Sequence, residues 1–447
     1  MTSLSHYDLF IVGGGSGGLA AARRAADYGV QVAIAEPASL GGTCSARGCI
    51  PKKLMVYASG FSQLFEDAVG YGWSKSDSQF DWQKMIAAVN HEVQRLDKLH
   101  ADSLKTAGVS LFRAKATFVD SHMLEVRGQK ITADKILIAV GGKAIKPDIL
   151  GIEHALVSDQ MFHLPEQPNH LAIVGGGYIG VEFAGIMQGL GTQVTQIIRE
   201  DMILKKFDEM IRTEVQNGMI QHGVHCLTNT EVTSIEKMPE GLQLTLSNSS
   251  HKIVNAVLFA TGRTPNVAEL RLENAKVEID RQAIAVNEFS QTNQSHIYAV
   301  GDCTNRVQLT PVAIAEGRAF ADTVFGKRHC RVNYNNIPSS VFSNPQAAFV
   351  GLTESEAQQQ FGVDNVIAYC TTFKPLFHSL TDRDDTASMK LVVDKKSDRV
   401  LGAHMVGEYA AEIMQIVAIA VTAGLTKADF DATMPLHPTS AEKFIML

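Results

Sequence analysis

Several features that define whole classes of protein are missing from this sequence of 447 residues. No apolar run is long enough to span a bilayer, and neither end carries a lipidation signal. Residues 1–6 contain no Lys or Arg, so the apolar stretch after them suits a buried strand better than a signal peptide. The net charge of −7 provides no basic field for nucleic acid. We therefore expect neither a membrane nor a nucleic-acid partner.

Cysteine is scarce and mostly scattered. Four of the six cysteines, Cys226, Cys303, Cys330 and Cys370, lie far apart in the chain and do not form a disulfide framework. This usage favours a reducing compartment, so we expect a cytoplasmic protein. We expect no metal centre.

The other two cysteines stand close together. Cys44 and Cys49 lie five positions apart within residues 41–53, and a loop that tightens into a helix can bring their sulfurs within bonding distance. A dithiol that opens and closes beside a redox cofactor moves electron pairs onto sulfur. The pair therefore predicts a disulfide reductase.

A long-range repeat indicates what kind of cofactor is present. Residues 9–18 recur as residues 171–180, and each copy reads as a buried strand, a Gly-x-Gly-x-x-Gly turn and a helix that starts at the last glycine. Two such copies predict two dinucleotide-binding folds. The candidate cofactor-binding residues of these turns are Gly13, Gly15, Ser16, Gly17, Gly18, Gly175, Gly176, Gly177, Tyr178 and Ile179.

The two copies differ at the end of their second strand. The first ends at Glu36, which is placed to accept hydrogen bonds from a ribose diol, as in an FAD site. The second copy has no acid at the matching position and continues with Arg199 and, further on, Lys205, which suits the 2′-phosphate of NADPH. Arg199 could instead be a solvated loop charge, and the adjacent Glu200 weakens the NADPH assignment.

Later segments complete the domain plan. Buried strands end at Gly141 and Gly262, and a third ends at Asp302, which could reach the flavin's ribityl chain or cap a helix. Thr310 opens a helix whose amino terminus could face the flavin. From about Tyr334 the pattern changes to an α+β domain. We expect a discontinuous FAD domain (1–145 and 266–333), an NADPH domain (146–265) and an interface domain (334–447), all of α/β or α+β class.

Five segments in family order carry a resemblance that spans essentially the whole chain. Residues 41–53, 260–266, 298–318, 337–357 and 437–442 resemble the flavin-dependent pyridine nucleotide–disulfide oxidoreductases, and most closely the members that reduce glutathione disulfide. The resemblance implies a homodimer with FAD and NADPH. It makes Cys49 the sulfur nearer the flavin and Cys44 the thiol that attacks the substrate. It makes His437, oriented by Glu442, the base that reaches into the partner subunit's site.

The resemblance also assigns supporting roles. Lys52 becomes a cation beside the flavin, Glu182 its partner, and Tyr178 the ring that covers the nicotinamide pocket. Gly42, Thr43 and Ala116 become further cofactor contacts.

The substrate is predicted from a third group of residues. Ser16, Arg23 and Arg318 fall where relatives contact glutathione disulfide, and His100 stands where they have a tyrosine. Arg23 could otherwise be an exposed helix charge. Ser45 and Ala46 between the cysteines also depart from the pattern and leave a related thiol open as substrate. The alternatives are an NAD-dependent dihydrolipoamide dehydrogenase and a non-catalytic, redox-sensing flavoprotein.

Overall fold

The first glycine turn follows the first strand of a seven-stranded sheet. The computed structural model describes residues 5–75 and 77–447. Strands β1 and β2 and strands β1 and β6 pair in parallel, and the sheet order is β3-β2-β1-β6-β5-β4, with β19 pairing with β6. The core of this sheet is a run of buried apolar strands, as the sequence predicts. The bounds are β1 Ser5–Val12, β2 Val32–Ala35, β3 Ser110–Phe112, β4 Ala116–Phe118, β5 Met123–Val126, β6 Gln129–Ile138 and β19 Ile297–Ala299.

The second glycine turn follows strand β9 in the middle of a five-stranded parallel sheet. Its order is β11-β10-β9-β15-β8, and an antiparallel ribbon of β12, β13 and β14 packs beside it. Two short strand pairs, β7 with β16 and β17 with β18, complete this part of the chain. The bounds are β7 Gly142–Ala144, β8 Leu156–Val157, β9 His170–Val174, β10 Gln193–Ile197, β11 His225–Leu227, β12 Val232–Met238, β13 Gly241–Leu246, β14 His251–Val254, β15 Ala256–Phe259, β16 Arg263–Pro265, β17 Ile279–Asp280 and β18 Ala283–Ile284.

The helices after the two glycine turns begin earlier than the sequence pattern suggests. Helix α1 spans Ser16–Ala26 and α6 spans Tyr178–Gly189, so each starts two residues before the last glycine of its motif. Gly15 and Gly177 hold extended backbone at the two N-caps, and the chain enters the helix directly after them. The amide groups of the first helical turn therefore lie inside the glycine loop.

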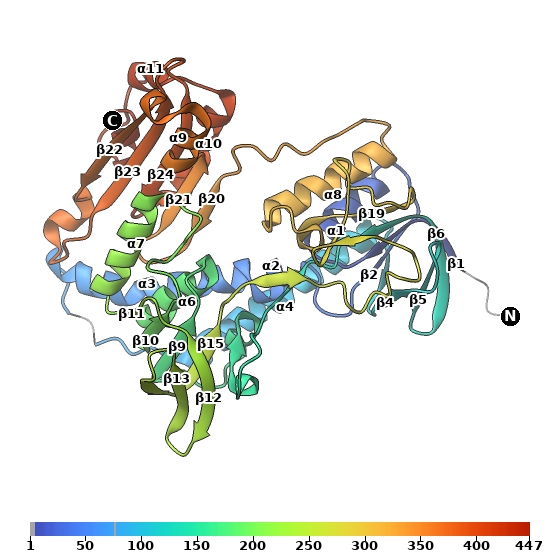
Figure 1. Ribbon diagram of the computed structural model, residues 1–447, viewed down its shortest axis with the longest axis horizontal. Helices are drawn as coiled ribbons and strands as arrows, with labels where there is room; N and C mark the ends of the chain where they lie inside the picture. Colours follow the sequence, from blue (N-terminus) through green and yellow to red (C-terminus); the bar gives the residue numbers. More distant parts are fainter. Residues whose placement is uncertain (1–4, 76) are drawn as a thin grey trace.

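The last quarter of the chain forms an antiparallel sheet with helices. Its strand order is β20-β21-β24-β23-β22, and α10 packs on β21 and β24 (Figure 1). The predicted fold class, two dinucleotide folds followed by an α+β domain, is confirmed. The bounds are β20 Ser339–Val341, β21 Ala347–Gly351, α9 Glu354–Phe361, β22 Val366–Phe373, β23 Ala387–Asp394, β24 Val400–Val406, α10 Ala410–Ala423 and α11 Lys427–Ala432.

Long helices join these parts. In Figure 1, α3 runs from the centre of the molecule, beside α2, towards the region below the C-terminal sheet. It packs on α6 of the second sheet and on α4. Within the described ranges, no helix is both long and apolar enough to cross a membrane. The remaining helices are α2 Gly42–Arg47, α3 Cys49–Gly70, α4 Trp82–Thr106, α5 Ser158–Met161, α7 Glu209–Gln221 and α8 Thr310–Val324.

Candidate active site

The two close cysteines lie on consecutive helices. Cys44 is in α2, and Cys49 is the first residue of α3. Gly48 separates the helices and allows a tight approach, since a Cβ there would come within 2.7 Å of the Thr43 carbonyl oxygen. No disulfide joins the two sulfurs in this structure.

The amino ends of two other helices meet at this dithiol. The Thr310 hydroxyl, at the start of α8, lies 3.7 Å from the Cys49 sulfur. The hydroxyls of Thr310 and of Ser16, at the start of α1, also act on the Cys44 thiol, whose pKa both of them lower. The sequence analysis assigned Ser16 and Thr310 to cofactor or substrate and missed their contact with sulfur. No local motif signals a contact between segments so far apart in the chain.

The two thiols have opposite acidities. The hydrogen bond that Cys44 donates lowers the pKa of Cys49 to about 6, and the Thr310 hydroxyl and the Lys52 charge act in the same direction against burial. The same hydrogen bond, together with burial, raises the pKa of Cys44. Cys49 also begins α3, where the helix dipole favours a thiolate. At neutral pH the negative charge therefore resides on Cys49 and the proton on Cys44.

A buried ion pair stands next to the thiolate. The Lys52 ammonium lies 2.6 Å from a Glu182 carboxylate oxygen, which brings together the two residues that the resemblance had paired. The same oxygen accepts the Phe342 backbone N–H at 2.9 Å, and the Lys52 ammonium sits 4.2 Å from the centre of the Phe342 ring. Phe342 therefore joins the C-terminal part to this site, a role that nothing in its sequence neighbourhood indicates.

The first glycine turn fits a dinucleotide. Gly13 has a φ of +107°, and a Cβ there would come within 2.4 Å of the Ala139 carbonyl oxygen. At Gly15, by contrast, an added Cβ would meet only ordinary van der Waals contacts, the nearest at 3.9 Å from the Ala139 carbonyl oxygen, so the backbone there stays open to close approach of a pyrophosphate. Glu36 accepts the Gly14 N–H at 2.8 Å, so its carboxylate is held at the turn.

Other residues predicted to bind the first dinucleotide lie elsewhere in and around the seven-stranded sheet. Ala116 is buried in β4. Burial raises the pKa of Asp302, although the nearby Arg263 opposes this. Arg263 also donates to the Thr43 hydroxyl at 3.4 Å, a contact that sequence reasoning missed. These residues could hold the cofactor, and their roles stay predictions.

The second glycine turn has the same backbone arrangement as the first. Gly175 has a φ of +126° and packs against the Ala260 carbonyl, while no heavy atom lies within 4 Å of a Cβ on Gly177. Arg199 and Lys205 lie beyond β10, with side chains 70% and 73% exposed. Both cations pair with Glu200. The second turn therefore also fits a dinucleotide.

The residues predicted to contact substrate lie on three helices. Arg23 on α1 and Arg318 on α8 are both exposed, and these helices pack closely together. His100 on α4 lies 3.5 Å from the Ser45 hydroxyl, one residue from Cys44. Burial and the nearby Arg23 lower the pKa of His100, which favours a neutral ring at pH 7. The structure thus places His100 beside the dithiol.

His437 is far from the dithiol of its own chain. Its Nδ1 lies 2.9 Å from a Glu442 carboxylate oxygen, which orients the ring as the resemblance implies. The imidazole is 78% exposed, and the C-terminal end of the chain lies well away from α2 in Figure 1. A single chain therefore does not bring this base to Cys44.

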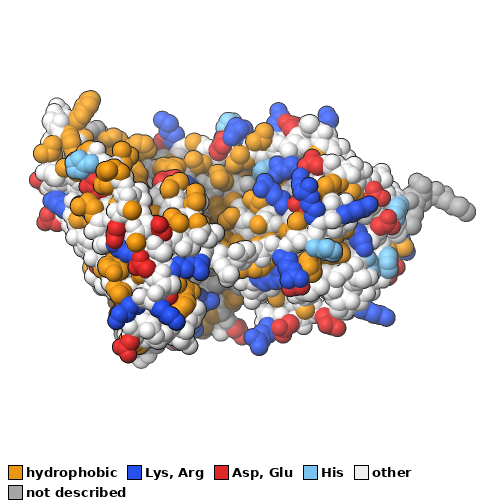
Figure 2. Space-filling model, turned by 90° about the horizontal axis from the view of Figure 1, so that it is seen from above, with side chains coloured by type: hydrophobic (Ala, Val, Ile, Leu, Met, Phe, Trp, Pro, Cys, Tyr) orange, Lys and Arg blue, Asp and Glu red, His pale blue; other side chains and the backbone are white. Residues whose placement is uncertain are grey.

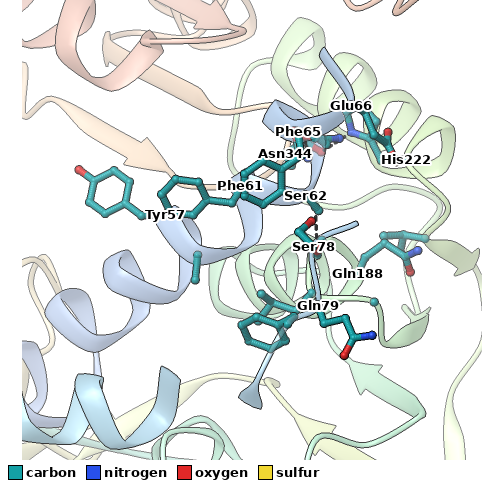
Figure 3. Close-up of a pocket in the computed structure, with 18 of the residues that line it drawn as sticks. Tyr57, Phe61, Ser62, Phe65, Glu66, Ser78, Gln79, Gln188, His222 and Asn344 are labelled. Atoms are coloured by element: carbon teal, nitrogen blue, oxygen red, sulfur yellow. Dashed lines mark hydrogen bonds between the residues drawn. The ribbon is translucent and has the colours of Figure 1, made fainter. Parts of the chain in front are cut away.

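A cavity of about 670 Å³ lies between α3 and the segment around α6. Figure 3 shows Tyr57, Phe61 and Phe65 of α3 on one side of it and Gln188 and His222 on the other. None of the residues predicted for the active site lines it. Among residues 5–75 and 77–447, no group of three His, Cys, Asp or Glu could hold a metal ion.

Comparison with known proteins identifies the family. Residues 7–317 match the pyridine nucleotide-disulphide oxidoreductase family, and residues 337–446 match the dimerisation domain of the same family. The chain belongs to the pyridine nucleotide-disulphide oxidoreductases. The predicted resemblance is thereby confirmed.

Curated relatives within this family match over nearly the whole chain. The chain is 56% identical over 454 residues to a glutathione reductase of Nostoc sp., with 99% of each chain covered. It is 45% identical over 442 residues to a glutathione reductase of Burkholderia cepacia, covering 99% of this chain and 98% of the relative. It is 43% identical over 454 residues to a chloroplastic/mitochondrial glutathione reductase of Pisum sativum, covering 99% and 82%.

Proposed function

We propose that this chain reduces glutathione disulfide to glutathione, using NADPH, FAD and the Cys44–Cys49 pair, as a homodimer. The observation that carries the proposal is the pair of unequal thiols beside a glycine turn that fits a dinucleotide. The full-length similarity to three proteins named glutathione reductase supports the choice of substrate.

Two groups of residues would hold the cofactors. Gly13, Gly15, Glu36, Thr43 and Asp302 would hold FAD, and the second turn with Tyr178, Arg199, Lys205 and Gly262 would hold NADPH. When bound, NADPH and FAD would supply the electron pair that reopens the Cys44–Cys49 disulfide. Lys52, held by Glu182, would place its positive charge beside the flavin ring.

The chain's own chemistry is thiol–disulfide exchange. Once Cys44 has lost its proton, its sulfur attacks one sulfur of glutathione disulfide, forms a mixed disulfide and releases the first glutathione. The Cys49 thiolate then attacks the Cys44 sulfur, which releases the second glutathione and closes the Cys44–Cys49 disulfide. Two electrons pass from the dithiol to the substrate. The base returns the Cys44 proton to one leaving glutathione, and the solvent supplies the proton for the other.

The first step needs a base because Cys44 holds its proton. His437 is the candidate, with Glu442 fixing its Nδ1 so that Nε2 faces outward. Since His437 is exposed and remote within one chain, we propose that it serves the site of the partner subunit. His100, Arg23 and Arg318 would contact the glutathione carboxylates and backbone.

Exposed apolar side chains support association through the helical and C-terminal parts. Figure 2 shows hydrophobic side chains gathered on the left of the molecule, the side on which Figure 1 places the C-terminal sheet. The exposed apolar side chains of α3 follow helical spacing and include Tyr57, Phe61, Leu64 and Phe65. Ile416 and Ile419 on α10 are exposed as well. Such faces are typical of surfaces that a second copy covers.

The domain boundaries and location complete the proposal. We keep the FAD domain at 1–145 and 266–333, the NADPH domain at 146–265 and the interface domain at 334–447. Four of the six cysteines are scattered along the chain and form no disulfide framework, which suits a reducing compartment, and we place the reaction in the cytoplasm.

A substrate panel with the purified FAD-loaded protein tests the function. We expect NADPH oxidation that depends on glutathione disulfide and exceeds the rate with lipoamide. Replacing Cys44 with Ser should abolish turnover while leaving FAD bound. A higher rate with NADH and lipoamide together would assign the chain to the dihydrolipoamide dehydrogenases instead. No turnover with any disulfide, in protein that binds FAD, would favour a non-catalytic flavoprotein.

A further inference from the structure

A carboxylate lies between the two cations proposed to hold the 2′-phosphate. One Glu200 oxygen is 3.1 Å from Arg199 Nε and 3.6 Å from Lys205 Nζ. The Glu200 side chain is 27% exposed, far less than either cation. Glu200 is therefore the inner group of the cluster, and the two cations reach over it from solvent.

The protein fixes Glu200 at this position. Its backbone carbonyl accepts the Asn229 N–H at 2.9 Å, which ties the segment after β10 to the segment after β11. Glu200 also lines a hollow of about 420 Å³ together with Arg199, Lys205, Asn229, Glu231 and Ser247. Two cations and two carboxylates line this hollow, so their formal charges cancel at neutral pH.

This charge balance affects which dinucleotide binds well. A 2′-phosphate carries close to two negative charges and must compete with Glu200 for both cations while being repelled by its carboxylate. A 2′-hydroxyl, in contrast, can donate a hydrogen bond to a carboxylate, as ribose does at the acid of NAD-binding folds. The same residue therefore opposes the phosphorylated dinucleotide and offers a partner to the unphosphorylated one.

We propose that Glu200 is a specificity-determining residue that lowers the preference for NADPH, so that the enzyme also reduces its disulfide substrate with NADH. The overall reaction with NADH consumes one NADH, one proton and one disulfide and yields NAD⁺ and two thiols. This inference rests on the proposed function for its turnover measurement. Its binding measurement does not depend on the disulfide substrate.

The first experiment compares kcat/KM for NADPH and NADH in the FAD-loaded enzyme. In the native enzyme the ratio should stay below about thirtyfold, which is the most that two exposed ion pairs supply. In Glu200→Gln the ratio should rise about tenfold, since one charge that repels the phosphate is gone. The rise should come from a lower KM for NADPH and a higher KM for NADH.

Asp201→Asn is the matched control. It removes the same charge one position further along, but the Asp201 side chain pairs with Arg212 at 3.5 Å and does not line the hollow. Its ratio should stay within about twofold of the native value. Equal changes in both variants would show a general field effect and overturn the assignment to Glu200.

The second experiment measures binding without turnover. Calorimetric titration of the holoenzyme with 2′,5′-ADP and with 5′-AMP should show that Glu200→Gln binds 2′,5′-ADP about tenfold more tightly relative to 5′-AMP. An unchanged ratio, or a native enzyme that binds only 2′,5′-ADP, would overturn the proposal. If neither dinucleotide supports disulfide reduction, the proposed function fails, while the titration still decides the role of Glu200.

Discussion

At the scale of single residues, the two thiols differ because they share one proton. Cys49 accepts the hydrogen bond, begins a helix and lies near Lys52, and each of these favours its thiolate. Cys44 donates the hydrogen bond and keeps its proton. The negative charge of the pair therefore resides on Cys49, and Cys44, the sulfur proposed to meet substrate, needs an external base.

Alkylation of the reduced protein should reveal this difference. The rate at Cys49 should rise with a midpoint near pH 6, because its pKa is lowered to about 6 and the thiolate already dominates at pH 7. In Cys44→Ser the midpoint should move up towards about 8.5, the ordinary thiol value, as the main stabilising hydrogen bond weakens. Mass spectrometry after iodoacetamide treatment over a pH series measures both. Cys370 serves as control. Its residue is exposed, but partial desolvation of the thiol and the nearby carboxylates raise its pKa, so it should react only in alkaline solution.

Removing one member of the Lys52–Glu182 pair should destabilise the protein. Glu182 is buried and the Lys52 side chain is only 11% exposed, so Glu182→Ala leaves a poorly solvated ammonium without its partner and should cost about 3 kcal/mol in the free energy of unfolding. Denaturant titration followed by FAD fluorescence measures this cost. The control is Glu92→Ala, which breaks an exposed pair with Arg95 and should change nothing measurable.

Sequence reasoning reached these residues unevenly. Cys44 and Cys49 stand five positions apart, so their spacing alone indicates a possible contact. Lys52 and Glu182 are 130 positions apart, and only the family resemblance suggested that they meet. The contacts of Ser16, Thr310 and Phe342 had no signal at all, because they depend on how separate helices and sheets come together.

At the scale of elements, the segment between β22 and β23 is tied to α3. The Arg383 guanidinium pairs with Asp67 of α3 at 2.8 Å and with Asp385, and His222 after α7 lies 3.2 Å from Asp385. The Tyr71 hydroxyl donates to the Phe377 carbonyl at 2.7 Å. Charged contacts therefore join the C-terminal part to both dinucleotide folds.

This network should make stability depend on pH in acid. Burial raises the pKa of Asp385, but His222 and Arg383 outweigh it and lower the value to about 2. A carboxyl whose pKa is depressed on folding stabilises the protein above its unfolded pKa of about 3.9, and this contribution disappears as pH falls through the folded value. Asp385→Asn should therefore cost about 2 kcal/mol near pH 7, and the difference from the native protein should shrink below about pH 4.

Thermal unfolding of both proteins across that pH range measures the effect. Asp384→Asn is the control, since the neighbouring Asp384 is almost fully exposed and pairs with the exposed Lys374. A difference between native protein and Asp385→Asn that stays constant down to pH 3 would contradict the assignment.

Element types were predictable where the pattern was strong. The strands before both glycine turns are apolar and short, and the structure has them as β1 and β9. The start of the helices was placed two residues late because an apolar pattern shows where a helix packs, while its first turn depends on the N-cap backbone. The antiparallel ribbon β12–β14 has no such motif, and its place beside the second sheet follows from tertiary packing.

At the scale of the whole molecule, the distance between His437 and the dithiol makes the proposed site a property of two chains. Mixed dimers test this. Cys44→Ser and His437→Ala homodimers should both lack turnover, since each lacks one reacting group at both sites. After unfolding and refolding an equal mixture, half of the dimers pair one chain of each kind and hold one intact site, so about a quarter of the native activity should return.

The recovered activity must increase with time of mixing and must be absent when the two variants are mixed without exchange of subunits. Failure to recover activity, with subunit exchange shown by native mass spectrometry, would place the base within the same chain as the dithiol. The sequence could not settle this, because the repeat and motifs order the domains along one chain and say nothing about which copy's base faces which thiol.

The pairing of β19 with β6 also has a consequence for how the chain is made. Residues 297–299 complete a sheet that begins at residue 5 and whose neighbouring strand ends at residue 138. At ribosomal speeds of about 5–20 residues per second, the first sheet waits roughly 8–30 seconds for its last strand. The five-stranded sheet lies wholly within that interval of the chain. The seven-stranded sheet, which is started first, is thus finished after the five-stranded sheet inserted into it. Until β19 is made, the free edge of β6 is open to pairing with other chains, which would lead to aggregation.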